Sequence, residues 1–143
     1  MKLLLILLLG IALQAKNLHK ESYYQNIFCD KMGGKTEVVL KDRTRIDCLT
    51  EEYAIEVDFA NKWAESIGQS LHYGLMTKRQ SGVYLIIEDE KDFRYLDRLS
   101  TLAYLYGIEV WSSKADYRFV TMKKEYAPFD DIRAEIEGGI YAK

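Results

Sequence analysis

Apolar positions follow a helical period in some segments of the chain and an alternating or continuous pattern in others. The helical period marks helices, and the short apolar runs bounded by turn residues mark strands. Gly33-Gly34 and Gly107 are credible helix stops. The predicted order is a helix (17–32), three strands (35–40, 45–49 and 53–58), a helix (61–77), a strand (82–88), a helix (91–107) and a strand (108–111).

This order predicts an α/β fold with a central mixed sheet flanked by helices. The chain has 143 residues, which is enough for one domain with a sizeable core, and we expect that domain to cover residues 16–143. Its last part, 113–143, is a less legible extension. There YRFVTM could add an edge strand and PFDDIRAEIEGG a short terminal helix.

The first fifteen residues differ from the rest. Lys2 precedes an apolar run from Leu3 to Leu13, and Ala15 is a small residue at the place of a cleavage site. This pattern is typical of a signal peptide, and the run is shorter than the roughly 20 residues of a spanning helix. We therefore expect an exported protein, periplasmic or secreted. The alternative is an uncleaved segment that anchors the chain to the membrane.

Cys29 and Cys48 are the two cysteines of the chain. An oxidising compartment would let them pair, whereas they would otherwise remain two buried thiols. The formal net charge of −2 gives no basic footprint for nonspecific nucleic-acid binding. Net charge does not describe local charge, so a nucleic-acid partner stays open.

Acidic residues lie within the predicted strands. Glu56 and Asp58 share one face of the third strand by its period of two, and Asp47 is near the end of the neighbouring strand. A bulge at Arg43 in the hairpin turn would set Glu37 opposite Asp47, while a two-residue turn would put Glu37 on the other face. Carboxylates gathered on one face favour a hard divalent cation, and the alternative is a solvated sheet edge.

The helix after the third strand carries a polar stripe. At about 100° per residue, Lys62, Gln69 and Tyr73 fall on one narrow line. A separate apolar stripe, roughly opposite, is formed by Trp63, Ile67, Leu71 and Leu75. Taken alone, the polar stripe would be the solvent-exposed face of the helix.

The segments RID (45–47), EVD (56–58) and QSLHY (69–73), in this order and on these elements, resemble the PD-(D/E)xK nuclease superfamily. The Q-x-x-x-Y element is similar to that of its RecB-type branch. The resemblance covers about residues 20–110 and implies a restriction-endonuclease-like core, built as helix, three strands, helix, strand, helix and strand.

The resemblance also implies roles for single residues. Asp47 and Glu56 match the metal-binding acids, and the Val57 backbone carbonyl matches a third ligand. Asp58 departs from the pattern, which usually has lysine there, and it either recruits a second metal or spoils the site. Lys62 could deliver the missing ammonium from the start of the helix. Glu37 is the favoured early acid, with Glu21 as the alternative.

The implied chemistry is the hydrolysis of a phosphodiester with Mg²⁺ or Mn²⁺ as cofactor and with Asp47, Glu56 and Lys62 as catalytic residues. Its substrate would be a nucleic acid, with DNA favoured over RNA. Substrate contacts are expected from the helix and the turn that follows it: Gln69, Tyr73, Lys78 and Arg79. Two alternatives are a non-catalytic domain that binds nucleic acid or protein on the same scaffold, and an envelope protein whose polar stripe is solvated surface.

Overall fold

The structure is a computed structural model that describes residues 17–114. The predicted signal peptide lies outside these residues, and so do the edge strand and the helix predicted beyond residue 114. Within residues 17–114, no helix is long and apolar enough to span a membrane.

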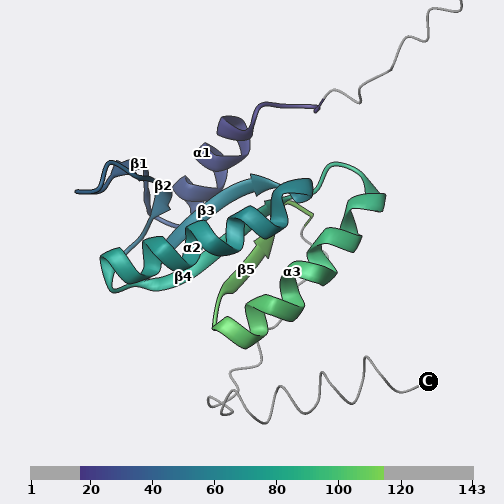
Figure 1. Ribbon diagram of the computed structural model, residues 1–143. Coiled ribbons are helices and arrows are strands. Elements are labelled where there is room, and N and C mark those ends of the chain that lie inside the picture. Colours follow the sequence, from purple (N-terminus) through teal and green to yellow (C-terminus); the bar gives the residue numbers. More distant parts are fainter. Residues whose placement is uncertain (1–16, 115–143) are drawn as a thin grey trace, which may run out of the picture.

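Three helices and a five-stranded sheet make up the fold (Figure 1). Two short 3-10 helices, η1 and η2, precede the second and third α-helices. The elements in chain order are α1 (Glu21–Lys31), β1 (Lys35–Val39), β2 (Arg45–Leu49), β3 (Tyr53–Phe59), η1 (Ala60–Lys62), α2 (Trp63–Thr77), β4 (Gln80–Ile86), η2 (Glu90–Asp92), α3 (Phe93–Tyr106) and β5 (Glu109–Ser112).

The sheet is mixed and its strands follow the order β1-β2-β3-β4-β5. The first three strands are antiparallel neighbours, whereas β3, β4 and β5 run parallel. In Figure 1, α2 and α3 lie over one face of the sheet and α1 over the other. The predicted α/β class with a mixed sheet is therefore confirmed.

Strand β4 shows how the two faces are filled. Val83 and Leu85 are fully buried in the cluster formed with α3, while Tyr84 between them points to the opposite face. There the Tyr84 ring stacks on Phe28 of α1 with centroids 4.0 Å apart. Apolar burial on both faces explains the nearly continuous apolar sequence of this strand.

The β1–β2 hairpin has the turn that the sequence predicts. Arg43 has a φ of 71°, and the Leu40 N–H donates to the Thr44 carbonyl at 2.8 Å. The pairs Val38–Ile46 and Thr36–Cys48 on either side set Glu37 opposite Asp47. The backbone at Arg43 therefore adopts the left-handed conformation that a glycine would take more easily.

Three residues of the apolar stripe predicted for α2, Trp63, Ile67 and Leu71, are partly buried and pack against the core, and the helix also buries a second face. Its buried residues are Ser66, Ser70, Tyr73 and Gly74. Leu75, which the prediction assigned to the apolar stripe, is 79% exposed, so that part of the prediction is wrong. The physical reason is close approach: a Cβ atom on Gly74 would lie 2.2 Å from the Ser81 hydroxyl, so small side chains face the sheet.

A disulfide between Cys29 and Cys48 joins α1 to β2. Both cysteines are fully buried, and Gly34 lies so close that a Cβ atom there would be 2.8 Å from each sulfur. The bond fixes the helix against the strand that carries Asp47.

Replacing both cysteines by alanine should lower the free energy of unfolding by about 3 kcal/mol, because the bond closes a loop of 19 residues in the unfolded chain. Urea denaturation of the oxidised protein and of the double variant measures this difference. A loss below about 1 kcal/mol would show that the bond does little to hold α1 in place.

Candidate functional site

The site forms where β2 and β3 separate. Their backbone pairing covers Cys48–Ile55 and Leu49–Ala54. One step further, the Val57 N–H donates to the Asp47 carboxylate (Oδ2) at 2.8 Å. A side chain thus takes the place of a backbone acceptor, and the last residues of β3 lie at an opening of the sheet.

Glu56 and Asp58 lie on β3 at this opening and are only 5% and 3% exposed. They alternate with Val57 and share the face of Ala54, which packs against Tyr73 of α2. The Glu56 carboxyl forms a hydrogen bond with Asp47. Its Oε2 atom is buried and accepts no hydrogen bond from the described residues. A buried oxygen without a partner is costly and calls for a donor or a cation.

Lys62 brings the one ammonium group seen in contact with these acids in the described part of the chain. Its Nζ lies 3.1 Å from Asp58 Oδ1 and 3.9 Å from Glu21 Oε2. Asp58 Oδ2 accepts a weaker hydrogen bond from the Ser66 hydroxyl at 3.4 Å. The lysine side chain is half exposed, so its ammonium lies between the acids and solvent.

Burial dominates the electrostatics of the acids. It raises the pKa of Glu56 to about 9, with the charges of Asp47 and Asp58 adding to the effect. Burial also raises the pKa of Asp47 to about 6, although the bond from Val57 opposes it. At neutral pH, Glu56 is therefore protonated, and its carboxyl group donates a hydrogen bond to the Asp47 carboxylate.

The pKa values of Glu21 and Asp58 also depend on the charge of Lys62. Burial and the charge of Asp58 raise the pKa of Glu21 to about 7. Burial raises the pKa of Asp58 as well, and the hydrogen bond and charge of Lys62 oppose that rise. Asp58 in turn raises the pKa of Lys62, so the ammonium stays charged.

Gln69 and Tyr73 reach the acids from α2. Tyr73 is 5% exposed, so it does not lie on a solvent-exposed face of the helix. Its hydroxyl forms a hydrogen bond with Gln69, and burial together with the Glu56 charge raises its pKa. The stripe of Lys62, Gln69 and Tyr73 therefore borders the acids.

Glu37 has partners of its own. Gln25 Nε2 donates to Glu37 Oε1 at 2.7 Å, and Arg45 Nε lies 2.6 Å from Glu37 Oε2. Gln25 also donates to the backbone carbonyl of Asp47 at 2.8 Å. Of the two acids considered for the early position, Glu21 is the one that contacts the Asp58–Lys62 pair.

The structure does not bring Lys78 and Arg79 to the acids. They follow the last residue of α2, roughly 24 Å along the helix from Lys62 at 1.5 Å per residue. Lys78 ends the helix in the left-handed conformation, and Arg79 donates to the Thr50 carbonyl at the β2–β3 turn. Both residues have structural explanations where they lie.

Sequence reasoning did not single out Gln25 and Ser66. Gln25 is 3% exposed and lies one helical turn after Glu21, and Ser66 lies one turn after Lys62. A polar residue at a buried helical position was the available signal. Both residues hold the backbone or side chain of an acid, so they position the site.

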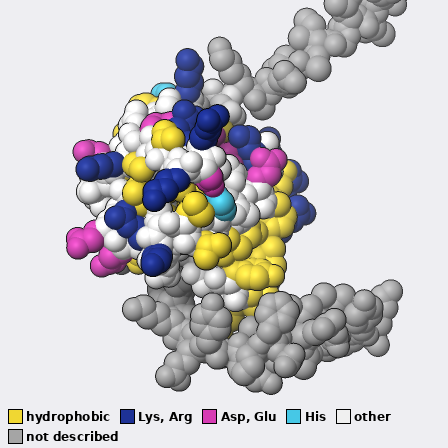
Figure 2. Space-filling model, turned by 60° about the vertical axis from the view of Figure 1, so that its left-hand side comes forward, with side chains coloured by type: hydrophobic (Ala, Val, Ile, Leu, Met, Phe, Trp, Pro, Cys, Tyr) yellow, Lys and Arg dark blue, Asp and Glu magenta, His cyan; other side chains and the backbone are white. Residues whose placement is uncertain are grey.

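The acids of the site have separate partners: Asp47 forms a hydrogen bond with Glu56, and Asp58 forms an ion pair with Lys62. Among residues 17–114, no three Asp, Glu, His or Cys side chains form a ready-made ligand set for a metal ion. Figure 2 shows a face on which Lys and Arg side chains are interspersed with acidic, apolar and uncharged ones.

Comparisons with protein-family models, with curated proteins and with solved structures give no match for this chain.

Between about pH 5 and 9, the free energy of unfolding of the metal-free protein should fall as pH rises. Folded Glu56 keeps its proton up to a pKa of about 9, whereas the unfolded chain releases it near 4.5, so the folded state binds more protons across this range. Glu56→Gln should flatten the fall, because glutamine stays neutral and can still donate to Asp47. Urea denaturation in a metal chelator at several pH values measures this. The exposed Glu51→Gln is the matched control, and equal slopes in all three proteins would contradict the assignment.

Proposed function

We propose that this protein is a divalent-metal-dependent phosphodiesterase that hydrolyses nucleic acid, with DNA favoured over RNA. The observation that carries the proposal is the gathering of Asp47, Glu56, Asp58 and Lys62 at the end of β3. A buried carboxyl oxygen without a partner lies within this group.

The arrangement of the elements supports a PD-(D/E)xK-type scaffold. The chain runs helix, three antiparallel strands, helix, parallel strand, helix and parallel strand, which is the order that the resemblance implies. The acids of that resemblance, Asp47 and Glu56, lie on adjacent strands. The QxxxY residues face them from α2.

The donor set suits Mg²⁺ or Mn²⁺, which take oxygen ligands. Asp47 and Glu56 would hold the ion, with the Val57 carbonyl as a third ligand and Asp58 at a second metal. Binding would replace the Glu56 proton by the cation, which satisfies the buried oxygen. The bound ion would supply charge neutralisation and an activated water.

The chain's own residues have separate tasks. Lys62 offers an ammonium at the solvent side of the acids, where it can stabilise negative charge that develops on a phosphate. Gln69 and Tyr73 offer an amide and a hydroxyl that can hydrogen-bond to the nucleic-acid backbone. Burial of the acids excludes water from the far side of the site.

The buried disulfide and the predicted signal peptide support an activity outside the cytoplasm, in the periplasm or the medium. An exported nuclease would meet nucleic acid that has left, or has not yet entered, a cell.

The second candidate is a non-catalytic binding domain on the same scaffold. Asp58 favours it, because this acid stands where the resembling family usually has lysine and it forms an ion pair with Lys62. If that pair persists when substrate binds, the ammonium is not available to a phosphate.

Asp47→Asn should abolish metal-dependent cleavage of DNA and RNA. Asparagine keeps an acceptor for the Val57 N–H but loses the charge that would hold the cation. Cleavage assays with Mg²⁺ and Mn²⁺ on single- and double-stranded substrates measure the loss of activity. Thermal melting with Mn²⁺ measures the loss of cation binding, since a cation that binds only the folded protein raises the melting temperature.

Glu51→Gln, an exposed change of equal charge, should leave both readouts as in the wild type. Cleavage that survives Asp47→Asn would move the active site elsewhere. Absence of any cleavage and of any Mn²⁺-linked shift in the wild type would favour the binding domain.

Lys62→Met should lower the cleavage rate by about a hundredfold, as expected when one group that stabilises developing charge is removed. The Mn²⁺-linked rise in melting temperature should remain, because Lys62 is not among the proposed ligands. Loss of rate together with unchanged metal binding is the signature of a catalytic ammonium. An unchanged rate would show that Lys62 serves only to neutralise Asp58.

A further inference from the structure

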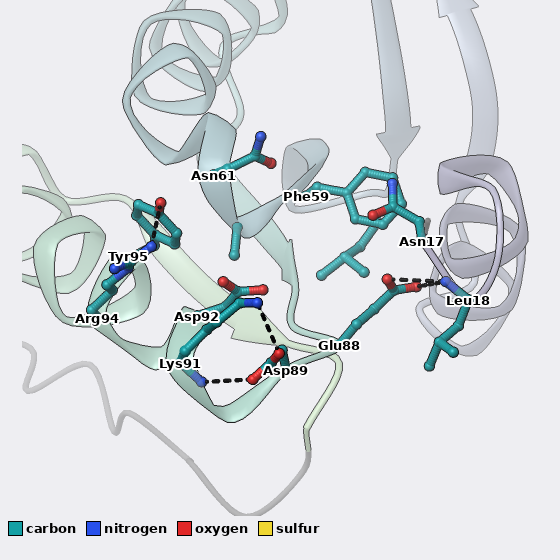
Figure 3. A pocket seen from close by; sticks show the side chains of 12 residues that line it. Asn17, Leu18, Phe59, Asn61, Glu88, Asp89, Lys91, Asp92, Arg94 and Tyr95 are labelled. Carbon is teal, nitrogen blue, oxygen red and sulfur yellow. Dashed lines mark hydrogen bonds and ion pairs between the residues drawn. The ribbon is translucent and has the colours of Figure 1, made fainter. Parts of the chain in front are cut away.

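A hollow of about 450 Å³ opens at the carboxyl ends of the parallel strands β3 and β4 (Figure 3). Its walls are the segment before α1, the β3–η1 junction and the η2–α3 turn. The crevice at the carboxyl ends of parallel strands is a common ligand site in α/β folds. The volume also lies within the range of about 300–1,000 Å³ for small-molecule pockets.

Glu88 builds one wall of the hollow and is fully engaged. Its carboxylate accepts from the Leu18 N–H at 3.0 Å, the His19 N–H at 3.3 Å and the Tyr24 hydroxyl at 2.8 Å. These bonds fix the segment before α1 against the end of β4. Glu88 is therefore a structural residue of the hollow.

Asp92 is the acid of the hollow that has no such task. It is the last residue of η2 and has helical backbone angles, and the cap of this helical segment is Asp89, whose carboxylate accepts from the Lys91 N–H at 3.0 Å. No hydrogen bond or ion pair to the Asp92 carboxylate is found among residues 17–114, and Figure 3 shows the carboxylate pointing into the hollow.

Apart from Glu88 and Asp92, the lining combines flat apolar surface with charges of both signs, and Asp89 Oδ2 lies 3.0 Å from the Lys91 ammonium. Phe59 and Ile86 supply apolar walls, and Tyr95 carries the Arg94 guanidinium 4.7 Å from its ring centroid. Arg94 and Lys91 are exposed residues at the η2–α3 side. A ligand that fits has a flat ring with hydrogen-bond donors on one edge and a negative group that reaches the mouth.

We propose that the hollow binds the guanine base of a nucleotide. Guanine presents N1–H and the 2-amino group side by side, and a carboxylate can accept from both. The Asp92 carboxylate takes this edge, the ring lies against the apolar walls, and the phosphate points toward the Arg94 guanidinium.

This assignment rests on the proposed function, which it extends to the choice of substrate. The β3–η1 junction, Phe59 to Asn61, lines the hollow and lies directly between Asp58 and Lys62 in the chain. A guanine held there places the neighbouring backbone of a nucleic acid beside the acids. Cleavage next to guanine is the expected consequence.

The test is calorimetric binding of guanosine monophosphate and inosine monophosphate to the full chain in a metal chelator. The two ligands share ribose, phosphate and N1–H, and only the 2-amino group differs. We expect guanosine monophosphate to bind at least about tenfold tighter, because one hydrogen bond to a charged group is lost with inosine. Asp92→Asn should remove this preference.

Asp97→Asn is the matched control, since it makes the same change of charge on the exposed side of α3 and should keep the preference. Thermal melting checks that both variants fold. Equal binding of the two nucleotides by the wild type, or no binding of either, overturns the assignment without need of a variant.

The assay is independent of the metal and of cleavage. Cleavage without guanine binding would remove the guanine site and keep the nuclease. Guanine binding without cleavage would keep the site and overturn the proposed nuclease.

Discussion

Buried carboxylate charge at the end of β3 is the constraint that the surrounding structure accommodates. Glu56 and Asp58 are almost fully buried, and a buried charge is costly unless it is paired or neutralised. The fold meets this cost in two ways: Glu56 keeps a proton and shares it with Asp47, and Asp58 forms an ion pair with Lys62. A divalent cation would be a third way, and it would use the same oxygen atoms.

The covalent frame of the site lies on the opposite face of the sheet. The Cys29–Cys48 disulfide ties α1 to the residue next to Asp47, and the stack of Phe28 on Tyr84 seats the helix on β4. Helix α1 also carries Glu21, whose Oε2 lies 3.9 Å from Lys62 Nζ. Stability and site geometry therefore depend on the same contact.

Much of this arrangement could be predicted because it follows from short-range rules. The period of a strand puts Glu56 and Asp58 on one face, and the pitch of a helix aligns Lys62 with Tyr73. The burial of Ser66 and the exposure of Leu75 could not be predicted, because they depend on how closely α2 approaches the sheet. The place of the Asp92 carboxylate in the hollow could not be predicted either, because it depends on how segments far apart in the sequence pack together.

The central claim is tested most directly by calorimetric titration of the metal-free protein with Mn²⁺ near pH 7.5, in buffers of different ionisation enthalpy. The account predicts binding whose apparent heat varies with the buffer, because the cation displaces about one proton from Glu56. In Glu56→Gln, binding should weaken and the dependence on buffer should vanish. No uptake of Mn²⁺ by the wild type, or uptake that releases no proton, would contradict the account.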